Sequence, residues 1–352
     1  MRLRLWSSVT TIIILLALLV AMPLLTACGG EEEPTTPTTP TTPTEPTTPS
    51  EPTTPAEPTT PAEPTTPAEP ATSEFDVVKD AVAAYLTDIA PNIKAADLQM
   101  RIAEGDAPYI VSLRKAEDYA KGHIPGAVNI AFGELTTLPE DEEILLYCYT
   151  GQSASFGTAV LGVLDYDVQN LLHGMSSWST DPDVYVSRFD PATSQGDYAV
   201  ETTANEGGNY ATPELENTTS SDAAEIILAA AKTVSPKYIT ASDLNMKIAE
   251  EEDMTILSVR SADDYAAGHI PGAINFGLSA LADNLDKLDP DAPVYVYCYT
   301  GHSAAQATSL LNMLGYDAYS IKFGMCGWSA DPAVNMGKCF DASTVAGYET
   351  EK

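Results

Sequence analysis

The sequence predicts an α/β protein built from two tandem copies of one domain, each a mostly parallel sheet flanked by helices. Three observations lead to this fold class. Motifs recur with a period near 150 residues, short β-branched runs alternate with helical patterns inside each copy, and apolar residues make up 44% of the chain. Alternation of strands and helices favours parallel strands covered on both faces, and the apolar fraction is sufficient for packed cores.

Four motifs recur in the same order in the two copies. They are an apolar run that ends in Arg, the hexapeptide Gly-His-Ile-Pro-Gly-Ala, an apolar run that ends in Cys-Tyr-Thr-Gly, and Gly-Met followed by a nearby Trp. They occupy residues 109–114, 122–127, 146–151 and 174–178 in the first copy, and 255–260, 268–273, 296–301 and 324–328 in the second. A repeat this long indicates whole domains rather than a solenoid.

The motifs set the expected domain boundaries. We expect the first domain at residues 74–190 and the second at 222–352, joined by an inter-domain linker over 191–221 that is rich in Asp, Thr, Asn and Gly. In the first copy, strands are expected at 109–113, 128–130, 144–148 and 168–172, and helices at 76–89, 115–121 and 153–164. Sites in open sheets of this kind form where strands end and helices begin.

The N-terminus has the features of a lipoprotein signal. A short basic region precedes an apolar run, which ends in Leu25-Thr26-Ala27-Cys28. This ending resembles the bacterial lipobox, so we expect residues 1–27 to be a lipoprotein signal peptide and Cys28 to carry the lipid. An uncleaved membrane anchor or a plain signal peptide are the alternatives. The prediction places the protein on the extracytoplasmic face of a bacterial cell membrane, tethered by lipid.

Residues 28–73 form a Pro/Thr-rich segment after the lipidated cysteine. A proline recurs at every third position from Pro34 to Pro70, and no apolar residue larger than Ala occurs between Glu31 and Ser73. Such a segment cannot form a core, and its prolines favour an extended polyproline-II conformation of about 3.1 Å per residue. We expect a disordered spacer, with a proline-motif ligand as the alternative.

The charge of the chain excludes two classes of partner. Fifty acidic residues against 17 basic ones give a formal net charge of −33. Nucleic acid and anionic membrane surfaces both repel such a chain. We therefore expect no nucleic-acid partner, and membrane contact through the lipid anchor only.

Two cysteines occupy equivalent places in the copies. Cys148 and Cys298 each end an apolar strand and precede a short glycine-containing loop, after which a helix begins. A tight loop turns backbone N–H groups towards the sulfur, and together with the helix dipole they favour an anion there. The pattern predicts a reactive thiolate. A buried, inert core cysteine is the alternative.

Together, the four motifs resemble a rhodanese domain, over residues 75–190 and 222–341. The resemblance implies a five-stranded parallel α/β domain without a cofactor, in which the loop cysteine accepts a sulfane sulfur as a persulfide and passes it on. It implies a sulfurtransferase with Cys148 and Cys298 as catalytic nucleophiles, a small sulfur-containing donor and a thiophilic acceptor. The lipobox-like N-terminus places this activity outside the cytoplasm. The implied substrate-binding loops are Tyr149, Thr150, Gly151, Gln152 and Ser153, and Tyr299, Thr300, Gly301, His302 and Ser303.

The two copies depart from the family pattern at two positions. Ser153 and Ser303 stand where many catalytic rhodaneses have Arg, and Ser112 and Ser258 stand where Asp is frequent. An uncharged loop lacks a charge-assisted contact to a dianionic donor, so thiosulfate should bind less well. The alternative function is therefore a catalytically weak or inactive binding or sensing module displayed on the membrane surface.

The histidines and the repeated arginines have simpler interpretations. The motif histidines His123 and His269 should make structural hydrogen bonds, whereas His302 in the second loop either supports the Cys298 thiolate when protonated or faces solvent. In each copy, the arginine that ends the first motif is expected to pair with a nearby carboxylate. The expected pairs are Arg114 with Asp118 and Arg260 with Asp264. No metal-ligand spacing is present, so no metal is predicted.

Two cysteines occur only in the second copy. Cys326 and Cys339 could form a disulfide that closes a short C-terminal loop in an oxidising compartment. Alternatively, Cys326 could resolve a persulfide or disulfide at Cys298. Ser176 stands at the position of Cys326 in the first copy.

Overall fold

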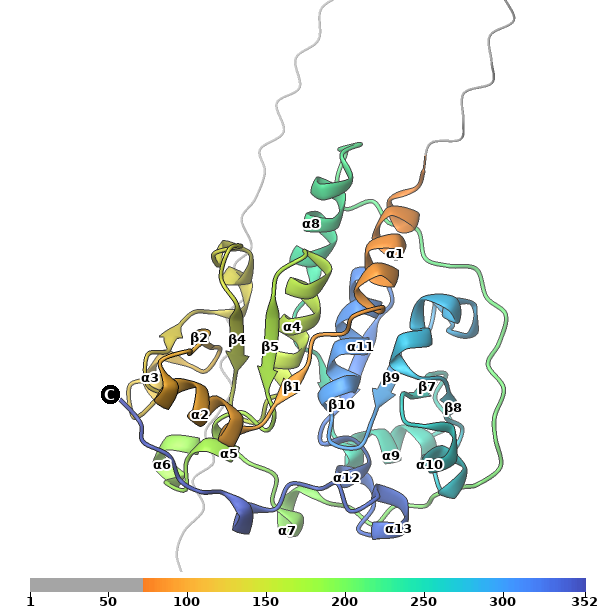
Figure 1. Cartoon of the computed structure of the whole chain (residues 1–352). Helices are drawn as coiled ribbons and strands as arrows, with labels where there is room; N and C mark the ends of the chain where they lie inside the picture. The colour runs from red at the N-terminus through yellow and green to blue at the C-terminus, as the bar shows by residue number, and fades with distance from the viewer. Residues whose placement is uncertain (1–71) are drawn as a thin grey trace, which may run out of the picture. The chain divides into compact units, whose positions relative to one another are not determined.

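A computed structural model of the protein describes residues 72–352, which contain two five-stranded sheets (Figure 1). The expected signal peptide 1–27, the lipidation site Cys28 and nearly all of the expected spacer 28–73 lie outside the described residues. Within residues 72–352, no helix combines the length and the apolarity that crossing a bilayer requires.

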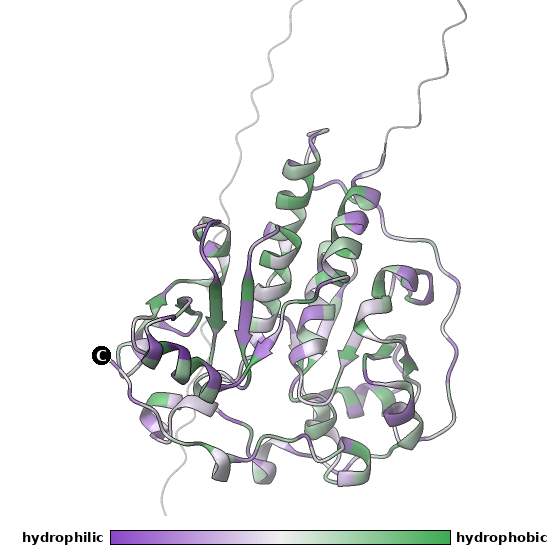
Figure 2. Cartoon of the chain, in the orientation of Figure 1, coloured by the Kyte–Doolittle hydropathy of each residue, from purple (hydrophilic) through white to green (hydrophobic). Residues whose placement is uncertain are grey.

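The first sheet has the order β1-β5-β4-β2-β3, and every neighbouring pair is parallel. Its strands are β1 (Asn92–Ile93), β2 (Tyr109–Ser112), β3 (Val128–Asn129), β4 (Ile144–Tyr147) and β5 (Val168–Leu171). All four residues of β4 are buried, and Figure 2 shows this strand as hydrophobic along its length. A continuous apolar run of this kind is typical of a strand covered on both faces. The predicted parallel α/β fold class is confirmed.

The helices of the first domain cover both faces of this sheet. They are α1 (Glu74–Tyr85), α2 (Ala95–Glu104), α3 (Ala116–Tyr119), the 3₁₀ helix η1 (Phe132–Thr137), α4 (Gln152–Val163), α5 (Met175–Trp178) and α6 (Pro182–Tyr185). The short helix α7 (Pro191–Ser194) follows in the expected linker and has no buried residue. Alternate residues of β4 point to opposite faces: Leu145 packs in the cluster of α2 and α5, whereas Leu146 packs in the cluster of α4.

The second domain repeats this arrangement, with the strand order β6-β10-β9-β7-β8. Its strands are β6 (Tyr238–Ile239), β7 (Thr255–Ser258), β8 (Ile274–Asn275), β9 (Val294–Tyr297) and β10 (Ala318–Ile321). Its helices are α8 (Ala223–Thr233), α9 (Ala241–Ala249), α10 (Ala262–Ala267), η2 (Leu278–Asp283), η3 (Leu285–Lys287), α11 (His302–Met313), α12 (Gly324–Trp328), α13 (Pro332–Asn335) and η4 (Ala342–Thr344).

The two domains share one apolar core built from α1, α4, α8 and α11. Nearly every residue of α4 and α11 is buried, because one side of each helix packs on its own sheet and the other on its counterpart. The Ser309 hydroxyl donates a hydrogen bond of 3.1 Å across this interface to the Phe156 carbonyl. Since α4 and α11 are the helices that follow the two cysteine loops, their packing brings these loops to the same interface (Figure 1).

Candidate active site

Each candidate nucleophile lies between the end of a central strand and the start of a buried helix. Cys148 follows β4 and Cys298 follows β9, and the two residues are only 2% and 3% exposed. Gly151 and Gly301 precede the helices with φ of 79° and 90°, a left-handed conformation that glycine adopts without strain. The structure thus places both predicted residues at the strand-to-helix turn where the sequence expects them.

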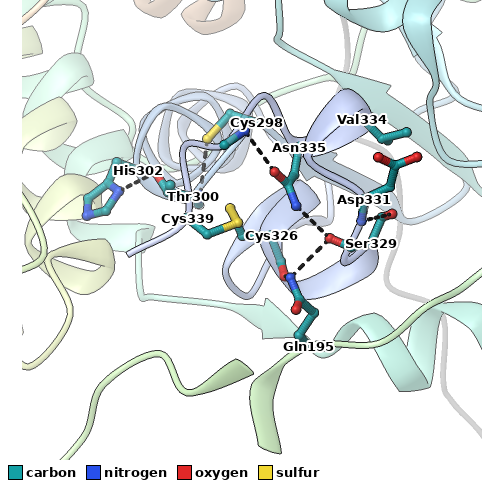
Figure 3. The surroundings of a disulfide bond; sticks show 12 residues. Gln195, Cys298, Thr300, His302, Cys326, Ser329, Asp331, Val334, Asn335 and Cys339 are labelled. Atoms are coloured by element: carbon teal, nitrogen blue, oxygen red, sulfur yellow. Dashed lines mark hydrogen bonds between the residues drawn. A yellow bond between two sulfur atoms is a disulfide. The ribbon is translucent and has the colours of Figure 1, made fainter. Parts of the chain in front are cut away.

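The loop backbone supplies a donor to the second sulfur. The Gly301 N–H donates a hydrogen bond of 3.1 Å to the Cys298 Sγ (Figure 3). Because α11 begins at His302, the same sulfur lies near the positive end of a long buried helix. Both features favour a negative charge on sulfur, whether on a thiolate or on a persulfide.

The first N–H groups of a short helix, α5 in the first domain and α12 in the second, donate hydrogen bonds to each cysteine loop. In the first domain the N–H groups of Met175 and Ser176 donate 2.9 Å hydrogen bonds to the carbonyls of Cys148 and Tyr149. In the second, Met325 and Cys326 donate to Cys298 and Tyr299 in the same way, also at 2.9 Å. The Gly-Met-x-x-Trp motif therefore fixes the cysteine loop through its backbone.

The loop tyrosines point away from the sulfurs and anchor the loops to a neighbouring helix. The Tyr149 hydroxyl donates a 2.6 Å hydrogen bond to the Asp118 carboxylate on α3, and Tyr299 donates to Asp264 on α10. The hydrogen bond from Lys121, followed by that from Tyr149, lowers the pKa of Asp118. Burial and the Asp118 contact raise the pKa of Tyr149 to about 12, so this hydroxyl remains a donor at neutral pH.

The predicted pairing of the two motif arginines with carboxylates is wrong. Arg114 donates to the backbone carbonyls of Val184, Asp118 and Gly122 at 2.6–2.8 Å. Arg260 donates in the same manner to the carbonyls of Val334 and Gly268. The carboxylates of Asp118 and Asp264 instead accept from the loop tyrosines. The buried guanidinium groups thus satisfy carbonyls that converge from distant segments.

The motif histidines make the structural hydrogen bonds that their turns predict. His269 is buried, its Nδ1 lies 2.8 Å from the Tyr265 carbonyl and its Nε2 lies 3.1 Å from the Thr203 carbonyl. His123 repeats the first contact, with Nδ1 3.2 Å from the Tyr119 carbonyl. Each ring also stacks on the tyrosine of that contact, with centroids 3.7–3.8 Å apart.

His302 matches neither alternative expected from the sequence, because it is buried against the other domain. Its Nε2 lies 3.2 Å from the His173 N–H and 3.1 Å from the Thr150 carbonyl. A neutral ring accepts from the first or donates to the second, depending on which nitrogen carries the proton. Gln152 occupies the equivalent position in the first copy, and its Oε1 accepts from the Phe323 N–H at 3.2 Å. The fourth residue after each cysteine therefore binds the opposite domain.

Tyr238, at the start of β6, also crosses to the first domain. Its hydroxyl lies 2.9 Å from the Ser153 Oγ and its ring packs edge-on against Phe156. Ser153 stands where the resemblance leads us to expect arginine, so a phenol from the second copy lies beside the first loop at this position. Nothing in the motifs of the first copy predicts this contact.

The structure joins Cys326 and Cys339 in a disulfide beside the loop of Cys298 (Figure 3). In the first copy, the equivalent positions hold Ser176 and Arg188. There the Arg188 guanidinium donates a 3.0 Å hydrogen bond to the Ser176 carbonyl, so a noncovalent contact replaces the disulfide.

A small cavity lies between the two cysteine loops. Half of its lining residues are aromatic, hydroxyl groups come from both copies, and no Lys or Arg takes part. The lining residues are Thr150, His173, Ser176, Phe189, Thr300, Phe323, Cys326 and Phe340. Among residues 72–352, no three His, Cys, Asp or Glu side chains gather as metal ligands.

We expect acid to weaken the domain interface through His302. Burial lowers its pKa to about 3, whereas an imidazole in the unfolded chain titrates at about 6.5. The unfolded chain therefore takes up a proton that the folded chain refuses, and stability is lost as the pH falls below that value. Between about pH 8 and pH 5, this one group should lower the free energy of unfolding by about 2 kcal/mol, measurable by urea unfolding.

His302→Gln, which copies Gln152, is the matched variant for this measurement. It should show a correspondingly smaller loss of stability between the two pH values. His173, whose pKa burial lowers to about 4, contributes to the pH dependence of both proteins. An identical pH dependence in the variant and the parent would contradict the expectation.

Comparisons with known proteins agree with the motifs. The family described as "Rhodanese-like domain" matches residues 94–181 and 240–331, about half of the chain. "Thiosulfate sulfurtransferase GlpE" of Pseudoalteromonas translucida is 33% identical over 86 residues, which are 24% of this chain and 82% of that protein. The protein of the same name in Pseudomonas putida strain F1 is 34% identical over 86 residues, 24% of this chain and 78% of its own.

A solved structure from Staphylococcus aureus, described as a rhodanese-like domain protein, is also similar. It is 30% identical to this chain, and the match covers 26% of this chain and 90% of that one with a TM-score of 0.25.

Proposed function

Because the chain belongs to the rhodanese-like domain family, we propose that it is a sulfurtransferase that moves sulfane sulfur through persulfides on Cys148 and Cys298. Relatives named as thiosulfate sulfurtransferases support this class of reaction. The observation that carries the proposal is the common setting of the two thiols. Each ends the central strand of a parallel sheet and precedes a buried helix, and a loop N–H contacts the Cys298 sulfur.

The proposed reaction has two displacement steps. The cysteine thiolate attacks the outer sulfur of a donor R–S–S⁻, the donor S–S bond breaks, and R–S⁻ leaves with the bonding electron pair. The enzyme then holds Cys–S–S⁻, whose charge the loop amides and the helix N-terminus stabilise. An acceptor thiolate R′–S⁻ attacks the outer sulfur, which forms R′–S–S⁻ and returns the cysteine thiolate. Sulfur is moved without net oxidation or reduction.

The charge around the loops supports a donor of low charge. Neither loop, 148–153 or 298–303, contains Lys or Arg, and the cavity between them has no Lys or Arg in its lining. The cation that lies nearest a loop residue is the Lys338 ammonium, 3.5 Å from the centroid of the Tyr299 ring. A dianion such as thiosulfate gains no charge-assisted contact from the side chains of the loops or of this lining. An organic persulfide carries one charge fewer than thiosulfate and depends less on such a contact.

The setting of the enzyme is part of the proposal. Lipidation at Cys28, after removal of residues 1–27, would tether it to the extracytoplasmic face of a bacterial membrane, with residues 28–73 as a spacer. Its partners would be a small sulfur donor and a thiophilic acceptor, without nucleic acid. The domains themselves would extend over 74–190 and 222–352, on either side of the linker 191–221.

Peptide mass spectrometry tests the persulfide step directly. The full chain, with both loop thiols reduced, is exposed in turn to an organic persulfide and to thiosulfate. We expect one added sulfur atom on Cys148 or Cys298, removable by cyanide or dithiothreitol. The persulfide should load these thiols about tenfold faster than thiosulfate, since a missing charge-assisted hydrogen bond costs about that factor.

A binding or sensing module is the second candidate. It is favoured by the near-complete burial of both sulfurs and by serine at the family's arginine position in both copies. If neither Cys148 nor Cys298 gains sulfur from any donor, although iodoacetamide alkylates both, the transferase is refuted and the binding module remains.

A further inference from the structure

The last residues of the chain dock on the first domain rather than on their own. The Tyr348 N–H donates to the Trp178 carbonyl at 2.9 Å, and the Trp178 indole donates to the Glu349 carbonyl at 2.8 Å. His123 and Glu351 exchange two backbone hydrogen bonds of 2.9 and 3.0 Å as an antiparallel bridge. Figure 1 shows this C-terminal segment passing below the molecule and ending beside α3.

The segment that follows the first domain makes the equivalent contacts with the second. The Tyr198 N–H donates to the Trp328 carbonyl at 3.2 Å, and the Trp328 indole donates to the Ala199 carbonyl at 2.9 Å. Glu201 and His269 exchange two backbone hydrogen bonds of 2.9 Å. Each domain therefore lends its C-terminal extension to the other.

The two extensions share a sequence pattern as well as a docking mode. Residues 189–201 and 340–351 both begin with Phe-Asp and end with Tyr-x-x-Glu. The tyrosine ring packs on the tryptophan of the opposite domain, with centroids 5.0 Å apart for Tyr198 and 4.9 Å for Tyr348. The glutamate carboxylate accepts from a motif glycine N–H, Gly272 at 2.7 Å and Gly126 at 3.0 Å. Because the same hydrogen bonds and the same ring packing occur in both copies, this contact is a specific feature of the fold and not a chance contact of a linker.

A short path joins each extension to a cysteine loop. Trp178 belongs to α5, whose first N–H groups hold the carbonyls of Cys148 and Tyr149. On the other side of the loop, the Tyr147 hydroxyl accepts from the Ile124 N–H, next to the His123 bridge. The second domain repeats both connections through Trp328 on α12 and through Ile270, whose N–H donates to Tyr297 at 3.2 Å.

We propose that each extension positions the cysteine loop of the opposite domain, so that the two copies operate as an obligate pair. The C-terminal segment 347–351 holds the loop of Cys148, and segment 196–201 holds the loop of Cys298. Tyr348, Glu351, Tyr198 and Glu201 are positioning residues that never touch the sulfur. The idea rests on the proposed function of the two thiols, but the geometry of a loop can be measured whether or not it transfers sulfur.

The reactivity of each cysteine, measured separately, tests whether an extension acts on the loop of the opposite domain. In Tyr348→Ala, we expect iodoacetamide to alkylate Cys148 about tenfold faster, because a loosened loop uncovers a residue that is only 2% exposed, while the rate at Cys298 stays within about twofold. Tyr198→Ala should show the reverse pattern. Peptide-resolved hydrogen exchange of residues 148–152 and 298–302 should change in the same loop as the alkylation rate.

Further variants separate positioning from general destabilisation. Tyr348→Phe retains the ring and the backbone donor, so it should restore the parent rate at Cys148. A chain that ends at Ala346 should reproduce Tyr348→Ala. Loading of Cys148 with sulfur should slow as its alkylation quickens, since the loop backbone that orients the thiol is loosened while access is gained.

The outcomes are distinct from those of the function test. Changes at the domain that carries the substitution, equal changes at both cysteines, or no change at either would overturn the proposal. Absence of sulfur loading in the parent and in every variant would refute the transferase. The alkylation rates and the hydrogen exchange of the two loops would still decide whether each extension positions the loop of the opposite domain.

Discussion

A chain with serine at both Cys148 and Cys298 should lose sulfur transfer from an organic persulfide to a thiol acceptor by on the order of a thousandfold or more. The hydroxyl is a far weaker nucleophile than a thiolate, and it cannot form the persulfide that connects the two displacement steps. Steady-state transfer assays with the full chain measure the loss. The single variants measure the share of each domain, and a sum close to the parent rate would indicate two independent sites.

The fold of this double variant is the necessary control. Serine is nearly isosteric with cysteine, and both positions lie at strand ends where the backbone is held by Met175 and Met325. The unfolding midpoint and the near-ultraviolet circular dichroism should therefore stay close to those of the parent. Transfer retained by a folded double variant would place the chemistry outside the two loops.

Features that depend on local patterns could be predicted from the sequence. The buried strands β4 and β9 are continuous apolar runs, and the cysteine loops follow directly from where these runs end. The two-residue edge strand β1 is not predicted from the sequence, because Asn92–Ile93 carries no periodic pattern. The equally short edge strand β3 lies within the strand predicted over 128–130. The helix expected over 76–89 begins at Glu74 and ends at Tyr85, ahead of Pro91.

Features that depend on distant segments could not be predicted. The sequence favours Asp118 as the partner of Arg114, but the guanidinium donates to backbone carbonyls, one of them 70 residues away at Val184. His302 and Gln152 look like local loop residues, and only the packing of α4 on α11 directs them into the opposite domain.

The same limit applies to the extensions. Residues 196–201 fall in the expected linker, yet they dock on the second domain with a Tyr-x-x-Glu pattern that recurs at 348–351. The repeated Tyr-x-x-Glu pattern indicates a specific contact, since a linker without such a contact has no physical reason to share a pattern with residues 348–351.

Gly324→Ala should be the most damaging single substitution in the second site. Gly324 has a φ of +53°, and a Cβ there would lie 2.5 Å from the Cys298 carbonyl oxygen and 3.0 Å from the carbonyl carbon of Tyr299. These are backbone atoms of the nucleophile loop, which the Met325 N–H holds at 2.9 Å. We expect a loss of about 3 kcal/mol in the free energy of unfolding and loss of sulfur loading at Cys298, measured by denaturant unfolding and peptide mass spectrometry.

Gly105→Ala, at the end of α2, separates the two causes of this loss. Gly105 also has a positive φ, +76°, but a Cβ there meets no atom within 4 Å, so alanine pays only for the left-handed conformation, about 1 kcal/mol. Its Cys298 should still load with sulfur. If both variants lost equal stability and both kept a loading Cys298, the close approach of Gly324 to the loop would not matter. The difference between the two variants in the free energy of unfolding and in sulfur loading therefore measures how much Cys298 depends on the close packing of Gly324 against the cysteine loop.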